Sequence, residues 1–274
     1  LNAFQNPKQY ILFEDAEFPK VCSFNDGLVY AFGSVLGEQK TLMTKFDKYA
    51  DRGEDTTLKF GYSGSSVVAQ SLSDNNLAFF FHNKKGIANY VSKEYVGNIK
   101  NDGKEFSSIL RKDKIYIQKS VVPLENGKII IAGIYEKNNL GEQTTIEIDI
   151  YDPSTGSFGN GITIAEGQSD NAYGKYISCF KLKPNDVYCA YVSYESEFIS
   201  KLNIRHLRIT VNGLDASNPE NTVVKNFYTP YNFIKVIPYN EKEAIILFQT
   251  GNEGKDLYYY HITLENDEMV AKRY

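Results

Sequence analysis

The stretch LENGKIIIAGIYEKN, residues 124–138, places the turn-forming pair Asn126-Gly127 just before an apolar run at 129–131. An Asn-Gly pair between two runs of β-forming residues predicts a tight hairpin. The run before the turn, KSVVPL at 119–124, alternates between polar and apolar residues, whereas KIIIAGI after it is apolar on both faces. The stretch therefore predicts a hairpin whose second strand is buried on both sides.

This layout occurs five times along the chain, at intervals of about 50 to 60 residues. The residues that follow the five turns are Gly27, Asn76, Gly127, Asp186 and Lys242. The buried second strands are expected near 28–33, 77–82, 128–134, 187–192 and 243–248. An alternating third strand follows in each repeat, at 40–47, 86–93, 144–152, 202–210 and 256–264. Weaker fourth strands are expected in 55–63, 106–112 and 221–228.

Four antiparallel strands per repeat, with the second strand the most apolar, are typical of a β-propeller blade. A helical solenoid does not fit the strand periodicity, and an immunoglobulin-like sandwich would not repeat its own pattern at this spacing. The sequence predicts an all-β propeller of about five blades, with residues 1–274 forming one domain. PKQYILFED, at 7–15, is expected to be a lone strand that either belongs to a preceding blade or completes the last one.

The segment IEIDIYDPSTGSF, residues 146–158, resembles the kelch-type blade, whose third strand commonly runs into Tyr-Asp-Pro-x-Thr-x-x-Trp. Four residues fall on that pattern, while Phe158 replaces the Trp: Tyr151, Asp152, Pro153 and Thr155. The resemblance covers one blade of five, and the Gly-Gly doublet of kelch repeats is missing. It supports a propeller and implies no kelch function for this chain.

The composition agrees with a β-rich chain, because Tyr (21) and Phe (17) are abundant while Met (2) and Trp (0) are scarce. The formal net charge of -4 and the pI near 5.6 provide no basic field for a nucleic-acid backbone, so nucleic acid is not expected as a partner. The longest apolar runs are five residues, against the roughly 20 of a membrane helix. No membrane span is expected.

The chain begins at Leu1 and ends in MVAKRY. A closed propeller protects its strand edges, and exposed edges are costly. We therefore expect the chain to be part of a longer protein, or of an assembly in which another chain covers its ends.

Two cysteines, Cys179 and Cys189, flank the turn in SCFKLKPNDVYCAY. If residues 183–185 form the loop, these two cysteines lie opposite each other on neighbouring strands, close enough for a disulfide. Two buried free thiols in a reducing compartment are the alternative. Cys22, at the corresponding place in the first repeat, is expected to be a core thiol.

No catalytic, cofactor-binding or metal-binding residue is predicted. The three histidines, His82, His206 and His261, are not spaced as zinc ligands. Acidic clusters at 74–76 and 265–268 match turn residues better than a calcium loop.

The leading hypothesis is a non-enzymatic binding or assembly module at a cell surface or outside the cell, with a protein partner or self-assembly. A carbohydrate-active propeller enzyme, in which dispersed Asp and Glu residues act on a sugar, is the first alternative. The chain has no Trp for a sugar platform and no Asp-box pattern, and the Tyr residues at 258–260 are expected to pack between blades. An intracellular scaffold, with Cys179 and Cys189 as free thiols, is the second alternative. The absence of an Asn-x-Ser/Thr sequon leaves the chain unglycosylated at Asn.

Overall fold

The fold is that of a computed structural model. The chain divides into two compact units, residues 1–114 and 115–274, and each is described by itself. The structure describes residues 16–23, 29–35, 40–47, 49, 51–58, 68–71, 77–84, 92–100, 105–112, 116–136, 144–166, 173–196, 199–211, 213–217, 220–227, 234–250, 256–266 and 268–272.

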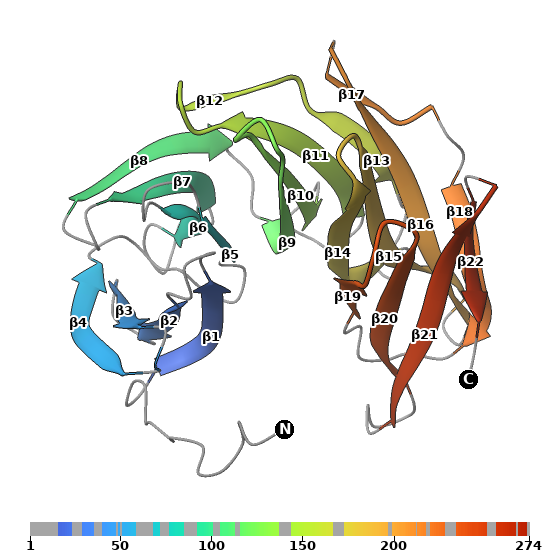
Figure 1. The fold of residues 1–274 in the computed structure, drawn as a ribbon, viewed down its shortest axis with the longest axis horizontal. Coiled ribbons are helices and arrows are strands. Elements are labelled where there is room, and N and C mark those ends of the chain that lie inside the picture. The colour runs from blue at the N-terminus through green and yellow to red at the C-terminus, as the bar shows by residue number, and fades with distance from the viewer. Residues whose placement is uncertain are drawn as a thin grey trace. The chain divides into compact units, whose positions relative to one another are not determined.

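Unit 1 contains two four-stranded antiparallel sheets, in which each strand pairs with the next along the chain (Figure 1). Sheet A consists of β1 (Ala16–Ser23), β2 (Val29–Val35), β3 (Lys40–Phe46) and β4 (Arg52–Leu58). Sheet B consists of β5 (Val68–Ser71), β6 (Leu77–Lys84), β7 (Ser92–Lys100) and β8 (Glu105–Lys112).

Unit 2 contains three antiparallel sheets, two of five strands and one of four. Sheet C consists of β9 (Tyr116–Pro123), β10 (Ile129–Glu136), β11 (Thr144–Asp152), β12 (Ser157–Phe158) and β13 (Ile162–Glu166). Sheet D consists of β14 (Tyr173–Lys183), β15 (Asp186–Ser196), β16 (Ile199–Thr210), β17 (Gly213–Asp215) and β18 (Glu220–Phe227). Sheet E consists of β19 (Ile234–Pro238), β20 (Glu243–Thr250), β21 (Asp256–Glu265) and β22 (Glu268–Lys272).

The predicted repeat is confirmed in both units. The second strand of every sheet lies where the sequence places it, and no helix occurs among the described residues. Four of the five third strands also agree. The exception is 86–93, because the third strand of sheet B is β7, which begins at Ser92.

That error has a physical cause. The prediction followed the more apolar letters of GIANYVSK, but the register is set by the full length of β6, along which Leu77 pairs with Ile99 and Lys84 with Ser92. Pairing along eight residues outweighs local hydropathy. Residues 86–91 lie outside the described part of the chain, as does the lone strand expected at 7–15.

The fourth position is split in two of the sheets. In sheet C both β12 and β13 pair with β11, and in sheet D both β17 and β18 pair with β16. Of the predicted segments, 106–112 falls in β8, 221–227 in β18 and 55–58 in β4. Residues 59–63 and 228 lie outside the described part of the chain.

Two apolar clusters hold the sheets of unit 2 together. The first cluster includes Ile130, Ile148, Cys189 and Leu207 and joins sheets C and D. The second includes Tyr188, Ile204, Ile246 and Phe248 and joins sheets D and E. Since successive side chains of a strand point to opposite faces, a strand such as β15 contributes to both clusters, which explains its continuous apolar sequence.

Two of the three β21 tyrosines pack between sheets, as predicted, and the third, Tyr259, does not. Tyr258 and Tyr260 pack against the second cluster and stack on Phe248, with ring centroids 6.1 and 5.2 Å away. Tyr259 points to the other face and is exposed.

Candidate functional site

The structure joins Cys179 of β14 and Cys189 of β15 in a disulfide, with their Cα atoms 4.0 Å apart. The two cysteines are directly opposed in the register, as the turn predicts. The loop itself is shorter than expected, because Lys183 pairs with Asp186 and only Pro184-Asn185 form the turn. A register shift between residues 181 and 183 takes up the extra residue, so the opposition of the cysteines is kept.

A second polar group lies on the other face of sheet D, at the hairpin end of β15. Nε2 of His206 lies 2.7 Å from Oδ1 of Asp186, and Nε of Arg208 lies 3.7 Å from the same oxygen. The Asp186 and His206 side chains are only 18% and 11% exposed, so this pair is shielded from solvent. Shielding strengthens the interaction between these groups.

Asp215, on the neighbouring strand β17, lies next to this polar group. In the register, Arg208 of β16 lies opposite Asp186 on one side and opposite Asp215 of β17 on the other. Directly opposed residues share one face of a sheet, so two carboxylates flank one guanidinium, separated by two strand spacings, roughly 10 Å. We call Asp186, His206, Arg208 and Asp215 the sheet D cluster.

The carboxylate of Asp215 is held in its ionised form. Its pKa lies below the usual value because the backbone N–H and the hydroxyl of Ser217 donate hydrogen bonds to it, and because Arg208 and His206 add positive charge. Asp215 is exposed to solvent.

Aromatic rings support the cluster from within the sheet. The imidazole of His206 stacks on Tyr188, with centroids 4.6 Å apart and planes at 10°. Tyr188 in turn stacks on Phe180, at 5.5 Å. The three rings lie on three adjacent strands and fix the imidazole plane beside Asp186.

Sheets C and E carry simpler versions of this arrangement at the same end. In sheet C, Nζ of Lys128 lies 3.5 Å from Oδ2 of Asp152. In sheet E, Nε2 of His261 lies 3.4 Å from Oε1 of Glu243, which repeats the carboxylate–histidine pair of sheet D. Of the three, the sheet D pair is the closest and the least exposed.

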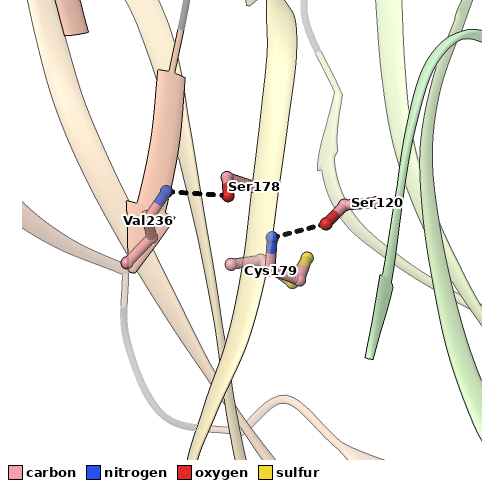
Figure 2. Close-up of a disulfide and its surroundings, with 5 residues drawn as sticks. Ser120, Ser178, Cys179 and Val236 are labelled. Carbon is pink, nitrogen blue, oxygen red and sulfur yellow. Dashed lines mark hydrogen bonds between the residues drawn. A yellow bond between two sulfur atoms is a disulfide. The ribbon is translucent and has the colours of Figure 1, made fainter. Parts of the chain in front are cut away.

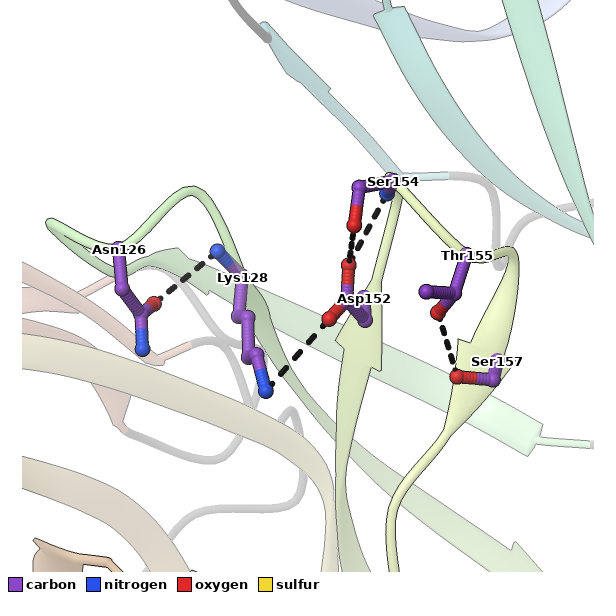
Figure 3. Close-up of polar contacts among 6 residues, drawn as sticks. All are labelled: Asn126, Lys128, Asp152, Ser154, Thr155 and Ser157. Atoms are coloured by element: carbon purple, nitrogen blue, oxygen red, sulfur yellow. Dashed lines mark hydrogen bonds and ion pairs between the residues drawn. The ribbon is translucent and has the colours of Figure 1, made fainter.

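The kelch-like segment forms the turn next to the sheet C pair (Figure 3). The N–H and hydroxyl of Ser154 donate to Oδ1 of Asp152, and the N–H of Gly156 donates to the Asp152 carbonyl. The hydrogen bonds from the Ser154 hydroxyl and N–H, with the charge of Lys128, hold the pKa of Asp152 below its usual value. The Asp-Pro-x-Thr letters thus act as turn chemistry here.

Sequence reasoning did not identify the sheet D cluster. The histidine spacing argues against a zinc site but gives no sign of the contact between His206 and Asp186. No group of three or more metal-ligating side chains occurs among the described residues. The missed signal is the spacing: a carboxylate at the start of the second strand and a histidine near the end of the third, present in two consecutive repeats. The acidic cluster at 265–268 contains a turn at Asn266, as expected, whereas 74–76 lies outside the described residues.

No protein-family model and no curated protein matches the sequence. The kelch resemblance therefore remains limited to the residues quoted above. Within the described residues, no helix is long and apolar enough to cross a membrane.

Solved structures do share the fold. A Hadza microbial sialidase matches 93% of this chain with a TM-score of 0.59 at 9% identity, and the chain spans 57% of it. The match with an α-L-arabinofuranosidase from Lactobacillus brevis covers 95% of this chain and 94% of the arabinofuranosidase, with a TM-score of 0.56 at 10% identity. The match with puromycin hydrolase covers all of this chain and 41% of the hydrolase, with a TM-score of 0.55 at 10% identity. The chain has the β-propeller fold.

Proposed function

We propose that this chain is a carbohydrate-active propeller and that the sheet D cluster is its site. The observation that carries the proposal is the row Asp186–Arg208–Asp215, in which two carboxylates flank a cation on one face of the sheet. Glycoside hydrolysis with inversion uses two acidic groups about 6.5 to 9.5 Å apart, with room for a water molecule between them. Two strand spacings provide a separation of that order.

The chemistry assigns a different role to each group. Asp215, held ionised by Ser217, accepts a proton from the attacking water, whose oxygen bonds to the anomeric carbon. The glycosidic C–O bond breaks, and the leaving oxygen takes the proton shared by the Asp186–His206 pair. Arg208 binds sugar hydroxyl or carboxylate oxygens between the two groups.

The fold supports this proposal. Two of the matching structures are named for enzymes that act on sugars, a sialidase and an α-L-arabinofuranosidase. The disulfide supports an oxidising, extracellular location and does not favour the intracellular scaffold, which predicted free thiols.

Hydrolysis of aryl sialosides and aryl arabinofuranosides by the purified chain tests the proposal. Asp215→Asn and Asp186→Asn should each reduce turnover by about 100-fold or more, the usual contribution of a general acid or base. Asp152→Asn is the matched control, since Asp152 has the same contact with a serine two residues on, and should keep full activity. Equal losses in all three variants, or no hydrolysis by the wild type, would refute the hydrolase.

One observation favours a second function, a non-enzymatic binding or assembly module. Ile237, Leu257 and Tyr259 share one face of sheet E and are 47%, 64% and 49% exposed. Exposed apolar faces of this kind are typical of interaction surfaces. Sedimentation velocity of the wild type and of Tyr259→Lys tests it, because a module that binds its own copies should lose its oligomer in the variant.

A further inference from the structure

We propose that the Cys179–Cys189 disulfide and two serine hydroxyls form one redox-controlled latch that joins the three sheets of unit 2. The disulfide lies on the face of sheet D opposite to the sheet D cluster, whereas Ser178 lies on the same face as that cluster. The residues of the latch lie on β9, β14 and β19, with Cys189 on the neighbouring β15, and these three strands are the first strands of sheets C, D and E. Each is the edge strand of its own sheet, and β14 lies next to both of the others.

Edge strands present backbone N–H groups that have no partner in their own sheet. At β14 the N–H of Cys179 donates to Oγ of Ser120 on β9, at 2.8 Å. At β19 the N–H of Val236 donates to Oγ of Ser178 on β14, at 3.0 Å. Figure 2 shows both bonds, one on each side of β14.

The two serines occupy equivalent positions in their sheets. Ser120 lies opposite Ala132 of its second strand, and Ser178 lies opposite Ala190 of its second strand. The same contact therefore occurs twice: a serine hydroxyl of one sheet accepts a hydrogen bond from a backbone N–H of the edge strand of the next sheet. Since each bond spans two sheets, it depends on the position of both backbones.

Strand β14 is the strand that both contacts share, because the Cys179 N–H donates one hydrogen bond and Oγ of the adjacent Ser178 accepts the other. Its regular pairing with β15 is short. Register shifts occur between residues 173 and 177 and again between 181 and 183, which leaves only 177–181 in regular register. The disulfide fixes the central residue of that stretch.

The disulfide is buried in the apolar cluster between sheets C and D, with Cys179 8% and Cys189 0% exposed, so a thiol reaches it only when β14 opens. Arg205 lies directly opposite Cys189; its Nη2 donates to the Ala216 carbonyl, while its buried Nε has no hydrogen-bond partner among the described residues. A guanidinium stabilises the thiolates through which thiol–disulfide exchange proceeds. A dithiol reductant would break the S–S bond, form its own disulfide and transfer two electrons and two protons to the two cysteines.

Amide hydrogen exchange on the full chain, before and after treatment with dithiothreitol, tests the latch. Reduction should lower the protection of the Cys179 and Val236 amides by about tenfold or more, a sub-global opening. The Leu124 amide, which donates to the Lys128 carbonyl inside the sheet C hairpin, is the internal control and should not change. Equal loss at Leu124 would show general destabilisation and overturn the latch, as would unchanged protection at Val236.

Serine variants separate the two contacts without touching the disulfide. Ser178→Ala should lower protection at Val236 alone, and Ser120→Ala at Cys179 alone, while the exposed Ser154→Ala should change neither. Reduction of Ser178→Ala should then produce little further loss at Val236, because the two changes act through one contact. If reduction and Ser178→Ala lowered the protection of the Val236 amide additively, the disulfide and the serine would act separately, which would contradict the latch. A disulfide that resists the dithiol until the chain is denatured would identify a permanent staple and overturn the redox control.

Discussion

Sheets C and D begin with the same hairpin, built in two different ways. In sheet C, β9 and β10 keep one register from Ile129 to Ile134, and the loop is closed by Asn126-Gly127 and by two hydrogen bonds between Leu124 and its turn. In sheet D, β14 has a register shift on each side of Cys179, and a disulfide joins it to β15. Turn chemistry and apolar alternation suffice in one sheet, whereas the other has a covalent bond.

The two sheets also differ in how far the charged pair at the hairpin end is shielded from solvent. The hairpin end of sheet C carries an exposed ion pair, Lys128–Asp152, whereas the same end of sheet D carries the shielded pair Asp186–His206. Shielded charges lose hydration and stabilise a fold less than apolar contacts do. We infer that the disulfide offsets this cost in the sheet that carries the candidate site.

The largest effect should come from the core of sheet C. Ile130 is fully buried in the cluster between sheets C and D, so Ile130→Ala should lower the free energy of unfolding by about 2 to 5 kcal/mol. The matched control is Ile237→Ala, because Ile237 is 47% exposed and the same truncation there should cost less than about 1 kcal/mol. Urea unfolding measures both, and equal costs would show that the cluster does not hold the sheets.

Removal of the disulfide should come next. Its cysteines are 10 residues apart, and closing a loop of that size corresponds to about 3 kcal/mol of unfolding free energy. The double variant Cys179→Ala/Cys189→Ala should show this loss in the absence of reductant, and dithiothreitol should then have no further effect on it. A double variant as stable as the oxidised wild type would mean that β14 holds its register unaided, as β9 does.

A smaller effect is expected at the turn of sheet C. Gly127 has φ +79°, and an added Cβ would meet no atom within 4 Å, so Gly127→Ala tests backbone strain alone. We expect a loss of about 1 kcal/mol. Gly159→Ala is the control: its Cβ would make only ordinary contacts with Ile150, and the variant should unfold like the wild type. Thermal unfolding measures both variants, and an equal loss in Gly159→Ala would contradict the assignment of the effect to the backbone conformation of Gly127.

The smallest effect concerns the two lowered carboxyl pKa values. The Ser154 hydroxyl is the main cause for Asp152, whereas the Ser217 backbone N–H is the main cause for Asp215. Ser154→Ala should therefore raise the pKa of Asp152 more than Ser217→Ala raises that of Asp215, as followed by NMR titration. Because both pKa values are lowered on folding, their stabilising contribution is present above the usual Asp pKa and is lost as the pH falls through the folded value. The reverse order of shifts would contradict this assignment.

The sequence alone determined the repeat, its strand order and the opposition of Cys179 and Cys189. These features depend on local chemistry: turn residues at fixed offsets, and the period of two that sets which side chains share a face. The same information failed at β7, where pairing along the length of β6 decided the register.

Only the tertiary structure decided the candidate site and the latch. Asp186, His206 and Asp215 are separated in sequence by 20 and 9 residues, and their neighbourhood depends on how β15, β16 and β17 align. Ser120 and Ser178 look like ordinary strand serines until the sheets pack and bring each hydroxyl to the edge of the next strand. Sequence periodicity reports the face on which a side chain lies, but contacts between sheets follow from the packing of whole faces, which no single stretch of sequence contains.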